Sequence, residues 1–434
     1  MTIPIDIKSE IVSRREKLFS QMETNSVALF FASPEVTRSN DTYYPYRQNS
    51  DFWYFTFFSE PEALFLIIKQ NDNIPKCVLF NRKKDPLAEI WTGYRLGQKA
   101  AFDTILVNEA YLFDEIDKIL PDILNGKTSI YHADQQYEYA DRIVKRALTT
   151  LRQDAKLIGP NKLIDWRPIV HEMRMFKSDF EIAMLRKACE ISAQAHVRAM
   201  KICQPKLYEY QLEAEILHEF AWHGARSSSY NTIVGGGNNS CILHYENNGD
   251  SLKDGDLVLI DAGCEYQYYA GDITRTFPIN GKFNQAQRAI YDIVLASQYQ
   301  AIKLFKPGTS IMEVNNHVIR TMVTGLVNLG IMKGDVESLI TNKAYTAFYM
   351  HGLGHWLGMD VHDVGSGRDR ILEPGMVLTV EPGLYISQGA KAPECYKGIG
   401  VRIEDNILIT ESGNEVLTLG VPKDPEKIES LMRR

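Results

Sequence analysis

The chain contains no long apolar run, and we expect it to carry no leader sequence. The apolar stretch at residues 63–68 is far shorter than the about 20 residues that a membrane-spanning helix needs. Residues 1–6 contain no basic region followed by an apolar one, so we expect no secretory signal. These absences predict a cytoplasmic protein without a membrane partner.

Cysteine is sparse and irregularly spaced. The six cysteines form no Cys-x-x-Cys pair, and scattered single cysteines are typical of proteins in a reducing compartment. We expect all of them to be small buried apolar residues. They are Cys77, Cys189, Cys203, Cys241, Cys264 and Cys395.

Clusters of basic residues are absent too. The formal net charge is −7 and the pI is near 5.9, which argues against nucleic acid as a partner. The composition is that of a globular protein, with 44% hydrophobic and 24% charged residues. A length of 434 residues predicts two or three domains and a large core.

The first part of the chain alternates strand-like and helix-like segments. Segments rich in aromatic and aliphatic residues predict strands. These segments are residues 26–31, 51–58, 63–68, 77–80 and a very short one at 129–131. Residues 136–151 carry an apolar stripe and predict a helix. We therefore expect an α/β domain over residues 1–176.

A second domain is expected over residues 177–434. Ser178 and Glu181 have the spacing of a capping box at the start of a helix. Further helices are predicted at residues 207–222, 285–305 and 311–329. After Gly334 the pattern changes to strands and glycine-rich turns. Helices first and carboxylate-bearing strands later predict an α+β domain with an antiparallel sheet.

Four acidic residues lie in or near apolar, strand-like runs. Asp261 and Glu381 each follow such a run, and Glu404 lies inside one. Asp272 is separated from Asp261 by a glycine-containing segment, and a tight connection between two strands would bring both acids together. Surface turns are the ordinary alternative for Asp near Gly, but the neighbouring apolar runs argue against it. Converging buried carboxylates are costly unless positive charge neutralises them, so we expect a pair of divalent cations.

Three histidines lie in one glycine-rich stretch, residues 351–363. It is not the zincin helix motif, because Gly352 replaces the required glutamate and the glycines disfavour a helix. A single histidine is more often structural than a ligand, but three together are harder to dismiss. We expect His355 to bind metal and His351 and His362 to act as outer proton donors.

An oxygen-rich donor set with one imidazole predicts Mn²⁺ or a similar ion rather than a thiolate zinc site. Two bridged ions activate water and polarise a carbonyl, so the expected chemistry is metal-assisted hydrolysis. Arg402 lies two residues before Glu404 and would face the same side of a strand. A surface ion pair is the alternative, but we expect Arg402 to orient the acidic ligands.

Taken in order, these segments resemble the pita-bread metallopeptidases, a group with methionine aminopeptidase, aminopeptidase P, prolidase and creatinase. The matching segments are residues 259–263, 271–276, 351–363, 373–383 and 400–405. The N-terminal part is similar to the amino-terminal domain of the bacterial aminopeptidase P group. Its matching segments are residues 38–41, 44–55 and 89–97. The resemblance covers nearly the whole chain and implies a pita-bread fold for the second domain.

The resemblance also implies a ligand set for two metal ions. The matching positions are Asp261, Asp272, His355, Glu381 and Glu404. Asp272 and Glu404 would bridge both ions. Glu381 would also take the proton from the attacking water.

Further roles come from the same resemblance. His244 matches a histidine near the scissile bond. His351 and His362 match residues that contact substrate and stabilise the tetrahedral intermediate. Tyr385 and Arg402 match groups that support the ligands. The segment 363–370 is short and lacks an aromatic residue often found there, which affects contacts to the far side of the substrate.

Trp91 has two interpretations. It is either a core aromatic of the N-terminal domain or, as in relatives of the aminopeptidase P group, a residue that approaches a neighbouring subunit's active site. The second interpretation implies a homo-oligomer, a dimer or a tetramer, whose N-terminal domain assembles subunits and narrows substrate access.

The expected activity is release of the N-terminal residue from peptides with proline in second position. Proline has no N–H and a fixed φ, so a dedicated site is plausible. Prolidase activity on Xaa-Pro dipeptides is one alternative. A non-catalytic pita-bread module that binds peptides is another, although such relatives usually have broken metal ligands.

Overall fold

The computed structural model describes residues 7–70, 74–365 and 367–433. The chain divides into two compact units, one up to Met173 and one from Arg174 on. Each unit has its own hydrophobic core. Among the residues that the structure describes, no helix combines the length and apolarity needed to span a bilayer.

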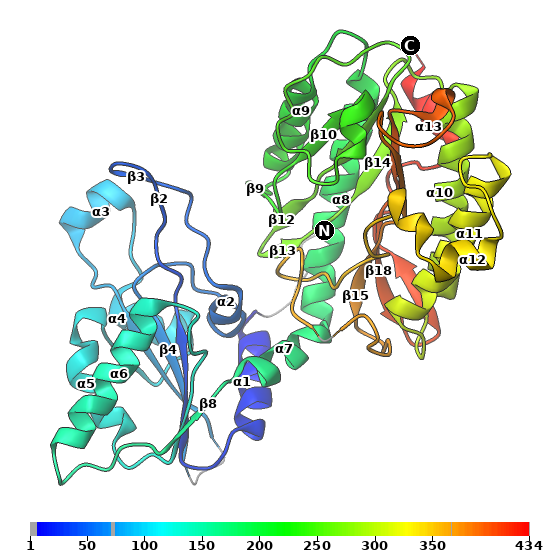
Figure 1. Ribbon diagram of the computed structural model, residues 1–434. Coiled ribbons are helices and arrows are strands. Elements are labelled where there is room, and N and C mark those ends of the chain that lie inside the picture. Colours follow the sequence, from blue (N-terminus) through cyan, green and yellow to red (C-terminus); the bar gives the residue numbers. More distant parts are fainter. Residues whose placement is uncertain (1–6, 71–73, 366, 434) are drawn as a thin grey trace. The chain divides into compact units, whose positions relative to one another are not determined.

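The first unit (Figure 1) contains a six-stranded sheet. Its strand order is β6-β5-β4-β1-β7-β8. Its strands are β1 (Ser26–Phe31), β4 (Leu64–Lys69), β5 (Lys76–Asn81), β6 (Glu109–Leu112), β7 (Ser129–Tyr131) and β8 (Lys162–Ile164). The pairs β1–β4 and β4–β5 are antiparallel, whereas β1–β7, β7–β8 and β5–β6 are parallel. A separate hairpin consists of β2 (Thr37–Ser39) and β3 (Thr42–Tyr43).

Helices accompany this sheet, as the α/β prediction requires. They are α1 (Ile7–Gln21), α2 (Ser50–Thr56), α3 (Pro86–Thr92), α4 (Gly97–Thr104), α5 (Ile116–Leu124), α6 (Glu138–Gln153) and α7 (Arg167–Met175), the last of which contains the division between the units. The stripe predicted on α6 is buried at Ile143 and Val144, which share a core with Val27 and Leu29 of β1. That packing follows from the 3.6-residue period of the stripe.

The strand predicted at residues 51–58 is wrong, because this segment forms α2. The Asn49 side chain accepts a hydrogen bond from the Phe52 N–H and caps the helix. Phe57 ends it in the left-handed conformation, with φ of 52°. Every residue of α2 is buried, so the aromatic residues reflect burial on all sides and not a strand.

The second unit contains small antiparallel sheets, which confirms the predicted pita-bread α+β architecture. The three-stranded sheets are β10-β11-β14, β13-β12-β9 and β15-β18-β19, and β16 pairs with β17. Their strands are β9 (Ser227–Ser228), β10 (Ile233–Gly236), β11 (Leu257–Asp261), β12 (Cys264–Tyr266), β13 (Tyr269–Ala270), β14 (Thr274–Pro278), β15 (Val377–Val380), β16 (Gly383–Ile386), β17 (Ile399–Arg402), β18 (Asp405–Thr410) and β19 (Gly413–Val416).

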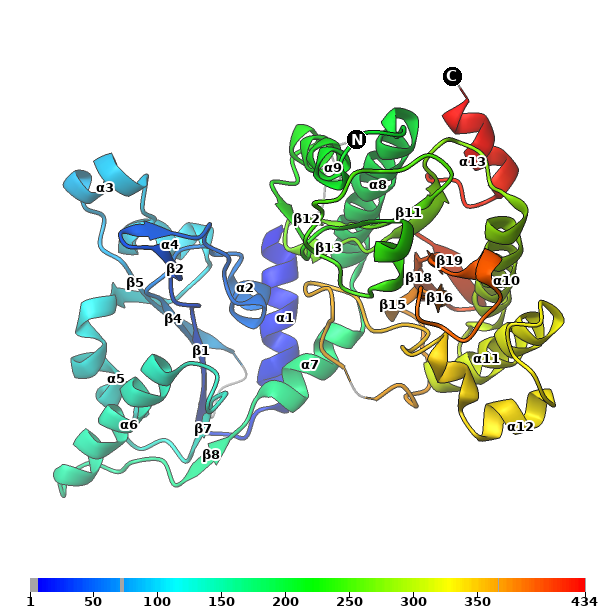
Figure 2. The same cartoon turned by 45° about the horizontal axis from the view of Figure 1, so that its top comes forward.

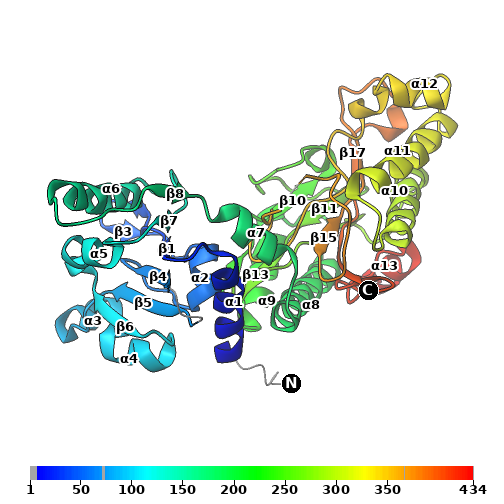
Figure 3. The same ribbon diagram turned by 90° about the horizontal axis from the view of Figure 1, so that it is seen from below.

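Two helix pairs flank these strands (Figures 2 and 3). They are α8 (Asp179–Ile202) with α9 (Glu209–Trp222), and α10 (Gln285–Leu304) with α11 (Ile311–Asn328). Two shorter helices are α12 (Val336–Thr341) and α13 (Pro425–Met432). The capping box predicted at Ser178 and Glu181 is present at the start of α8. The four long helices therefore begin within two residues of the predicted starts.

All six cysteines are free thiols. Four of them are buried, as predicted. Cys241 is half-buried and Cys395 is exposed, so the expectation of burial is wrong for Cys395. It lies in a short 3₁₀ helix (Glu394–Tyr396) before β17 that contains no buried residue.

Candidate metal centre

A cavity of about 520 Å³ in the second unit is lined by most of the predicted site residues. These lining residues are His244, Asp261, Asp272, His351, His355, His362, Glu381, Arg402 and Glu404. Tyr385 is not among the lining residues but hydrogen-bonds two of them. Sequence positions up to 160 residues apart are thus brought together around one cavity.

Two of the acids come from adjoining ends of one sheet. Asp261 is the last residue of β11, and Asp272 lies two residues before β14, its antiparallel partner. The connection between them is very tight, because a Cβ on Gly263 would lie 1.8 Å from the Gly271 carbonyl oxygen. Only glycine permits this approach. The two glycines therefore help to place both carboxylates at one site.

The remaining acids come from the other strand pairs. Glu381 follows β15, and Glu404 lies between β17 and β18. The His355 segment is fixed against β15: Thr379 N–H donates to the His355 carbonyl over 2.9 Å, and His355 N–H donates to Thr379 Oγ1 over 3.1 Å. Strand β15 thus positions both the imidazole and Glu381.

The side chains converge closely. His355 Nε2 lies 3.3 Å from Asp272 Oδ2 and 3.6 Å from Glu381 Oε1. Donor atoms of Asp272, His355 and Glu404 all lie within 4.8 Å of one another. One imidazole among acidic oxygens at this spacing matches the donor chemistry of a hard or borderline divalent cation.

The electrostatics of the site also fit a bound cation. Burial and the charge of Asp272 raise the pKa of Glu381 to about 7. Burial and the charges of Asp272, Glu381 and Asp261 raise the pKa of Glu404 well above its usual value. Burial lowers the pKa of His355. The hydrogen bond and charge of Asp272 outweigh this effect of burial, so the pKa rises to about 9. Ionised acids at this site therefore need positive charge that these protein groups do not fully supply.

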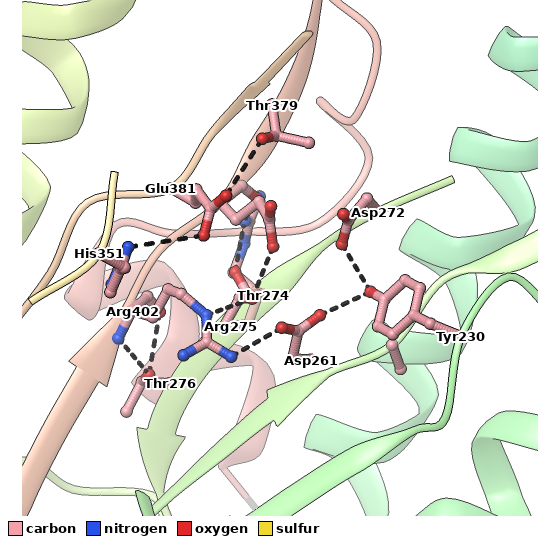
Figure 4. Close-up of polar contacts among 12 residues, drawn as sticks. Tyr230, Asp261, Asp272, Thr274, Arg275, Thr276, His351, Thr379, Glu381 and Arg402 are labelled. Atoms are coloured by element: carbon pink, nitrogen blue, oxygen red, sulfur yellow. Dashed lines mark hydrogen bonds and ion pairs between the residues drawn. The ribbon is translucent and has the colours of Figure 1, made fainter. Parts of the chain in front are cut away.

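Arg402 supplies part of that positive charge. It is buried, so the alternative of a surface ion pair is wrong. Its Nη2 donates to Asp261 Oδ2 over 2.7 Å, and its Nε donates to Thr274 Oγ1, which in turn donates to Glu404 Oε2 (Figure 4). One guanidinium therefore orients Asp261 directly and Glu404 through a threonine.

Arg402 also begins a hydrogen-bond chain to His351. Its Nη1 donates to the Tyr385 hydroxyl over 2.9 Å, and this oxygen lies 2.8 Å from His351 Nε2. The opposite ring nitrogen, Nδ1, lies 2.8 Å from the Gly352 carbonyl, which can only accept. Burial and the charge of Arg402 lower the pKa of His351 to about 4. The imidazole is therefore neutral at neutral pH, with Nδ1 protonated.

His362 and His244 lie at the open side of the site. The rings of His355 and His362 meet edge to face, with centroids 4.4 Å apart. Burial and the charge of His355 lower the pKa of His362. Both His244 and His362 line the cavity together with Arg368, so they can reach a molecule bound there.

Sequence reasoning missed Tyr230. Its hydroxyl lies 2.6 Å from Asp261 Oδ1 and 2.7 Å from Asp272 Oδ1 (Figure 4). Burial and the charges of these two acids raise the pKa of Tyr230 well above its usual value, so the phenol stays protonated and donates. No motif surrounds this tyrosine, and its contacts span 31 and 42 residues.

Glu209, at the start of α9, was also missed. It is fully buried and accepts four hydrogen bonds. Its donors are Gly236 N–H at 2.8 Å, Asn239 Nδ2 at 3.0 Å, Tyr245 hydroxyl at 2.9 Å and Asp250 N–H at 2.8 Å. These donors surround His244 in the sequence, so one carboxylate fixes the segment that carries it.

Trp91 lies in the first unit, on α3. Its side chain is 87% exposed, so the interpretation as a core aromatic is wrong. Its neighbours Leu87, Ile90 and Tyr94 are also strongly exposed, at 75%, 76% and 92%. Helix α3 contains no buried residue.

Each of the two units matches the sequence of a known protein family. Residues 183–411 match metallopeptidase family M24, and residues 11–131 match the N-terminal domain of aminopeptidase P. The chain therefore belongs to metallopeptidase family M24. It is 61% identical to the Xaa-Pro aminopeptidase of Escherichia coli (strain K12), with 98% of each chain covered. It is 52% identical to that of Haemophilus influenzae, with 98% of this chain and 97% of the relative covered.

Solved structures agree with this assignment. Aminopeptidase P from Escherichia coli in a low-pH form matches with a TM-score of 0.98 at 60% identity, and 99% of each chain is covered. Zinc-substituted Escherichia coli aminopeptidase P in complex with product matches with a TM-score of 0.97 at 61% identity, covering 99% of this chain and 98% of that one. The predicted resemblance to the aminopeptidase P group is confirmed.

Proposed function

We propose that this protein is a metal-dependent aminopeptidase that releases the N-terminal residue from peptides with proline in second position. The observation that carries this function is one cavity lined by four convergent carboxylates, one imidazole among them and three further histidines beside them. In the same chain, the first unit matches the N-terminal domain of aminopeptidase P. Both relatives described above are Xaa-Pro aminopeptidases.

We assign the five predicted ligands to two divalent cations. Asp261, Asp272, His355, Glu381 and Glu404 would hold them. When bound, the ions supply Lewis-acid chemistry and a lowered pKa for a coordinated water. Mn²⁺ is the ion we propose, because hard oxygen donors dominate the set. A solved relative also accepts zinc.

The chain's own groups would carry the proton transfers. Glu381 would take the proton of the attacking water. His362 lines the cavity and donates to the oxygen that becomes negative in the tetrahedral intermediate. Arg402 and Tyr385 hold Asp261 and His351 in place. His244 lies where the segment fixed by Glu209 reaches the cavity.

Prolidase activity is the second candidate function. Arg368 lines the cavity, and a guanidinium there can pair with the C-terminal carboxylate of a dipeptide. The match of the first unit to the N-terminal domain of aminopeptidase P favours the aminopeptidase over the prolidase. A comparison of an Xaa-Pro dipeptide with an Xaa-Pro-Xaa tripeptide decides between the two. The non-catalytic alternative is disfavoured, because all five ligand positions are intact.

Metal removal tests the proposal as a whole. Exhaustively chelated protein should lose hydrolysis of an Xaa-Pro-Xaa tripeptide and regain it when Mn²⁺ is added. The metal content is measured by elemental analysis at each stage. Full activity in protein without detectable metal would contradict the two-metal assignment. A preference for the dipeptide after reconstitution would make the protein a prolidase.

The first domain, residues 1–176, would assemble a dimer or tetramer and narrow the entrance to the catalytic domain, residues 177–434. The exposed apolar surface of α3 supports this assignment. Extended peptide ends would enter, whereas folded chains would not. We also place the protein in the cytoplasm, where free thiols are stable.

A further inference from the structure

The peptide groups of Asp272 are held by the side chain of a residue with no assigned role. Asp272 N–H donates to Asn406 Oδ1 over 3.0 Å, and Asn406 Nδ2 donates to the Asp272 carbonyl over 2.6 Å. Asp272 lies between β13 and β14, where it is not a paired strand residue. The side-chain amide of Asn406 thus supplies the two main-chain hydrogen bonds that a neighbouring strand would otherwise supply.

Asn406 is itself firmly placed. It is the second residue of β18, pairs with Thr379 of β15 and is completely buried. Its N–H donates to Thr418 Oγ1 over 3.2 Å, and its carbonyl accepts from Leu417 N–H over 2.8 Å. The Cys189 thiol donates to its Oδ1 over 3.2 Å. The side chain therefore has little freedom to leave Asp272.

The residue before it is fixed as well. Asp405 is buried and paired with Arg275 Nη2 over 2.7 Å and with Lys423. Arg275 Nη1 also donates to the carbonyl oxygens of Thr274 and Glu404. Asp405 thus holds the backbone of Glu404 through Arg275, and Asn406 holds the backbone of Asp272 directly. Glu404 and Asp272 are the two acids expected to bridge the metal ions.

We infer that Asn406 is a positioning residue. It sets the place of the Asp272 carboxylate by hydrogen-bonding both the N–H and the carbonyl of Asp272. This inference rests on the proposed metal site. Asn406 touches neither substrate nor reacting atoms, and its effect passes through the backbone of Asp272. Loss of groups that orient metal ligands typically lowers metal affinity by about 10- to 100-fold.

The test is calorimetric titration of Mn²⁺ into metal-free protein. Asn406→Ala removes both hydrogen bonds, and Asn406→Leu removes them while keeping the number and branching of the side-chain heavy atoms. Both variants should bind Mn²⁺ about 10- to 100-fold more weakly. Near-ultraviolet circular dichroism of the metal-free proteins shows whether each variant keeps its packed fold.

Asn248 provides a matched control. It is also buried, and its side-chain amide likewise makes one hydrogen bond to a main-chain N–H and one to a main-chain carbonyl, here of two different residues. Its Oδ1 accepts from Val234 N–H over 2.9 Å, and its Nδ2 donates to the Thr232 carbonyl over 2.9 Å. These contacts reach the main chain of Val234 and Thr232, neither of which is a proposed ligand. Asn248→Ala should therefore change the Mn²⁺ affinity by less than about threefold.

Each outcome decides the inference. Weak binding in both Asn406 variants, with native dichroism and an unaffected Asn248→Ala, supports it. It is overturned if the Asn406 variants bind Mn²⁺ like the unaltered protein, or if Asn248→Ala weakens binding equally. Loss of the dichroism signal in both Asn406 variants also overturns it, because Asn406 would then hold the whole fold. Failure of the unaltered protein to bind Mn²⁺ would instead overturn the proposed metal site.

Discussion

Each unit contains a group of one histidine and two acids, and the two groups differ in how their charges are neutralised. In the first unit the group is His132, Asp134 and Asp141. Asp134 is exposed, and Asp141 is half-buried. His132 Nε2 lies 2.8 Å from Asp141 Oδ1, and Gln135 N–H donates to the other oxygen. Water and local hydrogen bonds therefore stabilise these acids without a metal ion.

In the second unit the group is Asp272, His355 and Glu404. Two further acids, Asp261 and Glu381, line the same cavity. Asp272 and Glu404 are almost completely buried, at 4% and 2% exposed. The comparison teaches that residue types alone do not define a metal centre. Burial of several like charges, held in place by surrounding polar groups, is what requires a cation.

The sharpest test of this comparison removes one acid from each group. Glu404→Ala should lower kcat/KM on an Xaa-Pro-Xaa tripeptide by more than about 10³-fold, beyond the loss of one oxyanion donor. It should also reduce the metal content found by elemental analysis. Asp141→Ala should leave both quantities within about twofold, as expected for a solvated site. Similar losses in both variants would contradict the distinction between the two groups.

Beside the second group, His362 should act on the substrate and not on the metal. His362→Ala should lower kcat by about 10²–10³-fold, as for other oxyanion donors, if its imidazole donates to the oxyanion in the cavity that it lines, as we propose. The metal content should stay unchanged. Loss of metal in proportion to activity would make His362 a ligand. Kinetics and elemental analysis on one protein preparation separate the two roles.

The sequence predicted the second unit better than the first. Asp261 and Glu381 were recognisable because each comes directly after a run of apolar residues, and in the structure these runs form buried strands. The segment 51–58 misled because aromatic residues suit strands and buried helices alike, and its helix depends on the Asn49 cap and the left-handed Phe57. Local composition does not separate these two cases.

The residues that support the site were not predictable from local pattern. Tyr230 joins two acids, Glu209 gathers four donors, and Asn406 holds a peptide 134 residues away. Each is a common polar residue in an unremarkable segment. Its role appears only when distant strands meet, because a buried polar group is defined by its partners.

A smaller effect is expected from a buried histidine near the connection between Asp261 and Asp272. His196 on α8 donates from Nε2 to the Ala262 carbonyl over 2.9 Å, and burial lowers its pKa to about 4. The usual pKa is 6.5, so the unfolded chain binds more protons between these values. Stability therefore falls as pH falls through this window, by about 2 kcal/mol between roughly pH 7.5 and pH 5.

His196→Gln isolates this contribution. Glutamine can still donate to the Ala262 carbonyl but does not titrate, so the variant should lose about 2 kcal/mol less stability over the same pH interval. Urea unfolding of metal-free protein at both pH values measures the difference and avoids the pH dependence of metal binding. An identical pH dependence in the two proteins would show that His196 is not the group responsible.

The smallest expected effect concerns the first unit, whose contribution to substrate access remains a prediction. Trp91→Ala removes the largest side chain from the exposed apolar surface of α3. If this surface contacts a neighbouring subunit near its cavity, KM for longer Xaa-Pro peptides should change by roughly two- to tenfold, about 0.5–1.5 kcal/mol. KM for a tripeptide should change less. The melting temperature should be unaffected, because the side chain packs against no core in its own subunit.

Trp222 is a matched control for Trp91. It is 76% exposed on α9 of the second unit, so Trp222→Ala removes a similar exposed indole from a surface with no assigned role in access. That variant should leave KM independent of peptide length. Equal effects of Trp91→Ala on all peptide lengths, or effects no larger than those of Trp222→Ala, would exclude a role in access. The first unit would then differ from the second in having no part in substrate selection.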